Sequence, residues 1–128
     1  MVSDTHFGPV LGLFLVLSLF LGSCSKPAPE LPGFDKAAWA ADKGACNGSR
    51  TGMLETFKTN TDKLLSLSEV DLVGLLGRPD EEELYKRNQK FYYYYLQPAP
   101  TCEKNTGSAL RLVIRFNAVG LAKEVTVE

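Results

Sequence analysis

The sequence predicts an α+β fold in which two to three short N-terminal helices pack on one face of a three- to four-stranded antiparallel sheet. Three observations lead to this prediction. Helix formers and helix caps are concentrated before residue 80. Aromatic and β-branched residues alternate with polar ones after it. Cys46 lies among the expected helices and Cys102 among the expected strands, so that a bond between them would join the two layers.

Two short helices are expected before residue 65. The first runs through an alanine-rich segment (36–42), which Asp35 can cap and Gly44 ends. Ser49 can cap the second, because it follows the turn pair Asn47-Gly48. Its inward positions, at spacings near three and four, are Met53, Leu54, Phe57 and Leu64.

A third helix is predicted over residues 69–77. Ser68 and Asp71 form a variant of the capping box, Gly77 supplies the C-terminal cap and Pro79 prevents continuation. The sequence allows two alternatives for the apolar stripe that this helix buries: Val70, Val73 and Leu76, or Leu72, Leu75 and Leu76.

The rest of the chain predicts strands. The aromatic segment 90–96 can pair with 82–85 across a turn at 87–89. Residues 110–116 alternate in the manner of a half-buried strand, and a glycine-containing turn leads to an edge strand at 124–127. In the alternating strand, one side carries Leu110, Leu112, Ile114 and Phe116, and the other carries Arg111, Val113 and Arg115.

The N-terminal segment indicates export and lipidation. Residues 10–21 form an apolar stretch too short to span a bilayer, which is typical of a signal peptide. Leu21-Gly22-Ser23-Cys24 then resembles a lipobox, which implies cleavage after residue 23 and acylation of Cys24. The alternative is an uncleaved signal anchor in which Cys24 is an ordinary cysteine.

These features divide the chain into a signal peptide (1–23), a proline-rich tether (24–33) and one disulfide-bonded domain (34–128). The expected location is the cell envelope, with the lipid anchor as the membrane partner. Ser25 resembles an outer-membrane sorting signal. A tail without a role fits the tether's composition equally well.

Because exported proteins meet oxidising conditions, we expect Cys46 and Cys102 to form a disulfide. Closing the loop from residue 46 through residue 102 contributes roughly 4 kcal/mol in the chain-entropy model. Two free thiols are the alternative.

Composition excludes several classes of function. The chain has 14 basic and 15 acidic residues, and Asp4 is the only one of them in the signal segment, so the remainder is balanced and predicts no nucleic-acid partner. His6, the only histidine, lies in the signal segment. Histidine-dependent catalysis and most zinc sites are therefore not expected, and the sequence predicts no cofactor, no metal site and no catalytic residue.

Side chains for binding a partner are more plentiful than side chains for catalysis. In a strand, Tyr92 and Tyr94 share one side; we expect them on the uncovered face of the sheet, near Arg111 and Arg115. Tyrosine with arginine is typical of protein–protein contact sites. An ordinary amphipathic sheet surface, with tyrosines stacked on arginines, is the competing interpretation.

The chain resembles the small SmpA/BamE-type envelope lipoproteins in one region. The resemblance consists of residues 75–80, Leu-Leu-Gly-Arg-Pro-Asp, followed by an aromatic strand and a strand pair. The same region also resembles proteins whose units look like half of the β-lactamase inhibitor protein. This resemblance covers about residues 66–127 and implies helices on an antiparallel sheet. The Trp39-x-x-Asp42-x-x-x-Cys46 opening and the Gln89-Lys90-Phe91-Tyr92 strand are similar to those of uncharacterised lipoproteins of Bacteroidetes.

Three functions follow as expectations. The first is a non-catalytic lipoprotein that binds an envelope protein as a scaffold. The second is an inhibitor of a secreted lysozyme or protease, acting through the loop 98–107 that Cys102 stiffens. The third is an enzyme that uses carboxylates such as those of the acidic run 80–83, although a solvated turn is the simpler interpretation of that run.

Overall fold

The computed structural model describes residues 27–128. The predictions for the signal peptide (1–23), for Cys24 and for the first residues of the tether lie outside the described residues. In the part that is described, no helix is both long and apolar enough to cross a membrane.

The C-terminal half forms one antiparallel sheet of four strands in the order β1-β2-β3-β4. Each strand pairs with the next along the chain, so the sheet is a simple meander. The strands are β1 (Glu81–Tyr85), β2 (Gln89–Tyr95), β3 (Arg111–Phe116) and β4 (Ala122–Val127).

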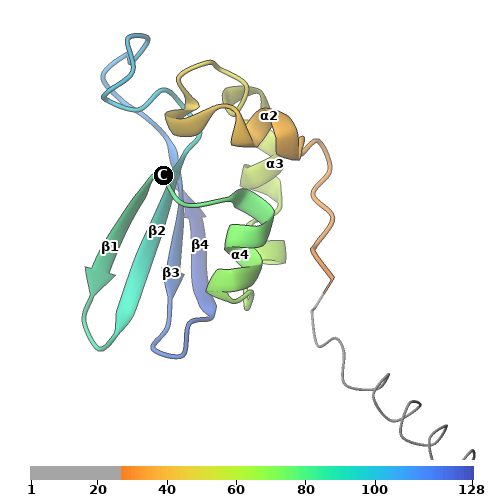
Figure 1. Ribbon diagram of the computed structural model, residues 1–128, viewed down its shortest axis with the longest axis vertical. Helices are drawn as coiled ribbons and strands as arrows, with labels where there is room; N and C mark the ends of the chain where they lie inside the picture. Colours follow the sequence, from red (N-terminus) through yellow and green to blue (C-terminus); the bar gives the residue numbers. More distant parts are fainter. Residues whose placement is uncertain (1–26) are drawn as a thin grey trace, which may run out of the picture.

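The N-terminal half consists of short helices. The α-helices are α2 (Lys36–Ala40), α3 (Leu54–Thr59) and α4 (Glu69–Leu76), and the 3₁₀ turns are η2 (Lys43–Ala45), η3 (Thr51–Met53) and η4 (Thr61–Leu64). These elements lie together on one side of the sheet, and the other side is left without a helix (Figure 1). The predicted α+β arrangement is therefore confirmed.

Helix α4 begins and ends where the sequence predicts. The Ser68 hydroxyl accepts from the backbone N–H of Asp71, and the Asp71 carboxylate accepts from that of Ser68. Gly77, at φ 77°, ends the helix. The stripe that faces the sheet is Leu72, Leu75 and Leu76, because Val70 is 81% exposed.

The expected second helix is split into three pieces. Ser49 does not cap it, and Met53 stands at the N-terminus of α3 instead. At its other end, Asn60 leaves the helical conformation while its side chain donates to the Thr56 carbonyl. Turn η4 then carries Leu64 into the core, where it is fully buried.

The last residues of the expected tether (24–33) pack on the domain. Leu31 is buried in the main core. The Thr56 hydroxyl donates to the Pro32 carbonyl at 2.8 Å, and the Lys63 ammonium donates to the Glu30 carbonyl at 3.1 Å. Burial of an apolar leucine side chain favours this docking over an extended tether.

Candidate functional site

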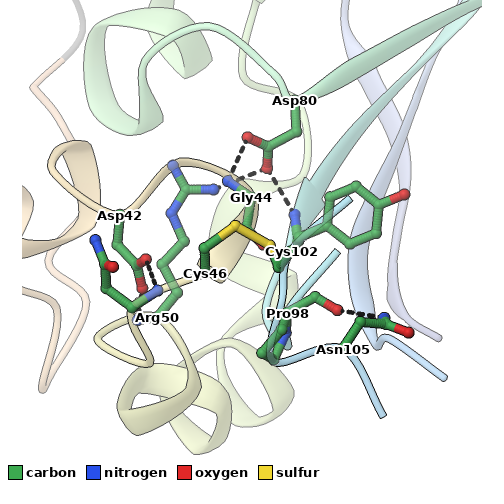
Figure 2. Close-up of a disulfide and its surroundings, with 10 residues drawn as sticks. Asp42, Gly44, Cys46, Arg50, Asp80, Pro98, Cys102 and Asn105 are labelled. Atoms are coloured by element: carbon green, nitrogen blue, oxygen red, sulfur yellow. Dashed lines mark hydrogen bonds and ion pairs between the residues drawn. A yellow bond between two sulfur atoms is a disulfide. The ribbon is translucent and has the colours of Figure 1, made fainter. Parts of the chain in front are cut away.

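A buried ion pair joins the helical layer to the start of the sheet. Arg50 Nη1 lies 2.8 Å from Asp80 Oδ2, and their side chains are only 2% and 9% exposed. Arg50 Nε donates to the Trp39 carbonyl at 3.1 Å, and its guanidinium lies 4.1 Å from the centre of the Trp39 ring. Figure 2 shows Arg50 and Asp80 pointing toward each other beside the disulfide.

The carboxylate of Asp80 also holds two backbone segments. It accepts from the N–H of Gly44 at 3.0 Å and from that of Tyr95 at 2.8 Å. Asp42, 1% exposed, accepts from the N–H groups of Asn47 and Arg50. Among the described residues, no buried side-chain nitrogen or oxygen is left without a hydrogen-bond partner. These polar contacts fix the position of β1 and β2 relative to the helices.

The predicted disulfide between Cys46 and Cys102 is confirmed, with the two Cα atoms 5.4 Å apart. The disulfide lies beside the Arg50–Asp80 pair (Figure 2). The Ala99 N–H donates to the Gly44 carbonyl at 2.9 Å, which adds a backbone link between the same two segments.

Away from the helices, the sheet presents a surface that we call the open sheet face. The pairs Phe91–Arg115, Tyr93–Val113 and Val113–Thr126 define which side chains share it. Its members are Glu81, Glu83 and Tyr85 of β1, Gln89, Phe91, Tyr93 and Tyr95 of β2, Arg111, Val113 and Arg115 of β3, and Glu124 and Thr126 of β4.

Aromatic rings cross the open sheet face from its edge toward its centre. The Tyr85 and Phe91 rings meet edge to face with centroids 5.3 Å apart, and the Phe91 and Tyr93 rings stack at 6.0 Å. The guanidinium of Arg111 lies 4.2 Å from the Tyr93 ring centre. We call Tyr85, Phe91, Tyr93 and Arg111 the aromatic row.

Hydrogen bonds hold the tyrosines of this face in place. The Tyr93 hydroxyl donates to Glu83, and the Tyr95 hydroxyl donates to Glu81, each at 2.7 Å. Burial, and then these bonds to carboxylates, raise the pKa of both phenols above the ordinary value. Both side chains are therefore neutral donors at neutral pH.

Beside the aromatic row, the open sheet face has a shallow hollow of about 380 Å³. Phe91 and Val113 form part of its lining, together with Arg115 and Thr126. Arg115 donates to Glu124 at 3.0 Å and to Gln89 at 2.7 Å, so its charge is held at the edge of the hollow. A hollow with an apolar floor and a polar rim suits a side chain of a bound protein.

The predicted positions of Tyr92 and Tyr94 on the uncovered face are wrong, whereas Arg111 and Arg115 do lie there. Tyr92 is 7% exposed and Tyr94 is fully buried under the helices. Their hydroxyls donate to Glu69 at 2.9 Å and to the Gly77 carbonyl at 2.9 Å. Burial, and then the bond to Glu69, raise the pKa of Tyr92 to about 12; burial also raises the pKa of Tyr94.

Strand register explains the error. Tyr92 lies opposite Ile114, and Tyr94 lies opposite Leu112, on the aliphatic side of β3. The opposite set in β2 contains Phe91 and Tyr93, which pair with Arg115 and Val113. The register with the aliphatic side of residues 110–116 thus leaves Phe91 and Tyr93 as the accessible aromatic residues.

The acidic run 80–83 does not form a cluster of carboxylates. Asp80 pairs with Arg50 in the interior, while Glu81 lies near Arg111 at 3.7 Å on the open sheet face. Glu82 points to the helix side and lies 3.5 Å from Lys90. Each of these three carboxylates is therefore placed next to a different cation, and Glu83 accepts from Tyr93.

Hydrogen bonds inside the loop 98–107 restrict its conformation. Asn105 Nδ2 donates to the Pro98 carbonyl at 2.8 Å (Figure 2). The Asn105 carboxamide oxygen accepts from the Gly107 N–H. Cys102 anchors the middle of the loop, whereas Thr101 and Glu103 on either side of it are exposed. This loop projects from the end of the molecule opposite to the two hairpin turns (Figure 1).

Comparison of the chain with protein-family models, with curated proteins and with solved structures finds no match.

Proposed function

We propose that this chain is a membrane-anchored, non-catalytic lipoprotein that binds another protein of the bacterial envelope through its open sheet face. The aromatic row is the observation that carries the proposal. It combines three aromatic rings and an arginine on a face that no helix of the described chain covers.

The geometry of the aromatic row supports binding. Its rings are held by stacking and by hydrogen bonds, so that little side-chain entropy is lost when a partner covers them. Aromatic and arginine side chains are the types most enriched among residues that dominate protein–protein affinity. The rigid core beneath, with Tyr94 bonded to Gly77, keeps the face in one shape.

The proposed anchor rests on the sequence. Leu21-Gly22-Ser23-Cys24 supports acylation of Cys24 and a location in the envelope, and Ser25 supports the outer membrane in particular. Labelling of growing cells with radioactive palmitate tests this: label enters the unaltered chain and is absent from Cys24→Ala. Equal labelling of the two proteins would refute the anchor.

Site-specific photocrosslinking in the lipidated chain tests the open sheet face. A photoreactive phenylalanine at position 91 should give one dominant protein adduct, and the same probe at exposed Lys58, in helix α3, is the matched control. Adding Arg111→Ala to the position-91 probe should reduce that adduct about tenfold, because it removes the cation of the aromatic row. An unchanged adduct in the Arg111→Ala variant would contradict binding through this face.

The loop 98–107, which the disulfide holds at Cys102, favours inhibition of a secreted hydrolase as a second candidate function. A loop held by Cys102 and by the Asn105–Pro98 bond is suited to enter an enzyme cleft without losing much conformational freedom. A hydrolase as the dominant adduct of the same probe at exposed Thr106 in this loop, with inhibition lost on reduction of the disulfide, would place this function ahead of the first.

A further inference from the structure

Three segments meet at one end of the domain, which we call the hairpin end. Because the sheet is a meander, the β1–β2 turn and the β3–β4 turn lie at the same end of it. The Glu69 N–H donates to the Gly120 carbonyl at 3.2 Å, so that the start of α4 lies against the β3–β4 turn. The loop 98–107 is at the opposite end (Figure 1).

The exposed apolar side chains gather at the hairpin end. Within residues 27–128, six large apolar side chains are exposed, and they are Leu65, Val70, Leu84, Tyr85, Val119 and Leu121. Leu84 and Tyr85 end β1, Val119 and Leu121 flank Gly120, and Val70 is in the first turn of α4. Leu65 precedes Ser66, whose N–H donates to the carbonyl of Ala122 at the start of β4.

Three of these side chains are almost fully in contact with solvent. Val70 is 81% exposed, Leu84 is 79% exposed and Val119 is 78% exposed. A single exposed leucine is ordinary on a soluble domain. The concentration of all six at one end, and of none at the other, indicates a surface that faces an apolar or interfacial environment.

The first described residues lie beside α4, whose start belongs to the hairpin end. Pro27, Ala28 and Pro29 line a hollow of about 170 Å³ there together with Val70 and Gly74. In Figure 1 the segment lies beside α4, and from there the chain continues to α2. Cys24 is three residues before Pro27, and three fully extended residues span at most about 11 Å.

We infer that the hairpin end rests on the lipid bilayer, with Leu84, Val119 and Val70 inserted at the level of the headgroups. The inference rests on the proposed acylation of Cys24 and adds to it a fixed orientation of the domain. An acylated Cys24 lies at the membrane surface, and a link of about 11 Å leaves the domain little freedom to turn this end away.

The chemistry of the β1–β2 turn fits a lipid surface. Tyr85 lies beside Lys86 and Arg87, and all three are exposed. Tyrosine is enriched at the membrane–water interface, and basic side chains reach the phosphates of anionic lipids. In this orientation the strands run toward the membrane plane rather than along it, so that the open sheet face is not in contact with the lipid. The loop 98–107 lies at the end of the domain farthest from the lipid.

Depth-dependent fluorescence quenching tests the orientation. The lipidated chain, with the disulfide intact, receives one extra cysteine labelled with an environment-sensitive dye, at Val119, at Leu84 or at the control position Thr106. It is reconstituted into vesicles of phosphatidylethanolamine and phosphatidylglycerol with or without spin-labelled lipid. The dyes at positions 119 and 84 should shift to the blue and lose emission to the spin-labelled lipid, and the dye at 106 should do neither.

The outcomes separate the orientation from the anchor. If the chain carries palmitate and stays with the vesicles while the dyes at 119 and 84 remain unquenched, the domain stands away from the bilayer and the inference fails. A blue shift without lipid quenching, lost on dilution of the protein in the vesicles, would mean that a second copy covers this end, which also overturns it. A chain that carries no palmitate and leaves the vesicles refutes the proposed anchor and the inference together.

Discussion

Arg50 and Asp80 form a buried ion pair at 2.8 Å across the boundary between the helices and the sheet, although thirty positions separate them in the chain. Each partner also makes hydrogen bonds to backbone, Arg50 to the Trp39 carbonyl and Asp80 to the N–H groups of Gly44 and Tyr95. Such a pair is costly to break singly, because the remaining charge stays buried.

Arg50→Met should therefore lower the free energy of unfolding by about 3–5 kcal/mol, measured by urea denaturation. Glu124→Gln is the matched control, because it breaks the half-exposed pair with Arg115 and should cost no more than about 1 kcal/mol. Equal effects of the two substitutions would show that the Arg50–Asp80 pair does not hold the layers together.

Removal of the disulfide should lower stability by roughly 4 kcal/mol, because it releases the loop from Cys46 to Cys102 in the unfolded chain. Thermal melts of the oxidised protein and of Cys46→Ser with Cys102→Ser measure the difference. Reductant should lower the melting temperature of the first protein and leave that of the second unchanged. Identical melting of both proteins without reductant would contradict the prediction.

Tyr94→Ala and Tyr93→Ala compare adjacent residues on opposite faces of β2. Tyr94 is fully buried and bonded to Gly77, so its truncation should cost about 3–5 kcal/mol. Tyr93 lies on the open sheet face, and its truncation should cost about 1 kcal/mol while it weakens the position-91 crosslink. If Tyr93→Ala lowered the free energy of unfolding more than Tyr94→Ala, then Tyr93, and not Tyr94, would lie on the side of β2 that the helices cover.

The stability of the domain should fall at alkaline pH. Burial raises the pKa of Tyr92 to about 12, whereas the phenol of an unfolded chain titrates near 10. The raised value means that the contribution of Tyr92 is complete below pH 10 and is lost as the pH rises toward 12. Urea midpoints between pH 9 and pH 12 measure this, and Tyr92→Phe should make the decline shallower; an unchanged slope would contradict it.

Local signals in the sequence determined helix α4 and strand β3. Ser68, Asp71, Gly77 and Pro79 mark the ends of α4 through bonds and backbone restrictions that involve only near neighbours. The alternation in residues 110–116 likewise identified β3 and placed Arg111 and Arg115 on one side together. The order of helices before strands was enough for the α+β class.

Only the tertiary structure decided which side of β2 is covered. Tyr92 and Tyr94 alternate with Phe91 and Tyr93 as aromatic residues, so that neither set is marked as inward by its own composition. The register with Leu112 and Ile114 made the choice, because both strands must bury the same side beneath the helices.

The same holds for contacts between residues that are distant in the chain. Nothing near Arg50 indicates that it pairs with Asp80, and nothing near Leu31 distinguishes a tether from a segment that fills the core. The gathering of Val70, Leu84 and Val119 at one end is also absent from any local pattern. Caps and alternation act within a few residues, whereas burial, ion pairing and the grouping of exposed side chains depend on how the layers pack.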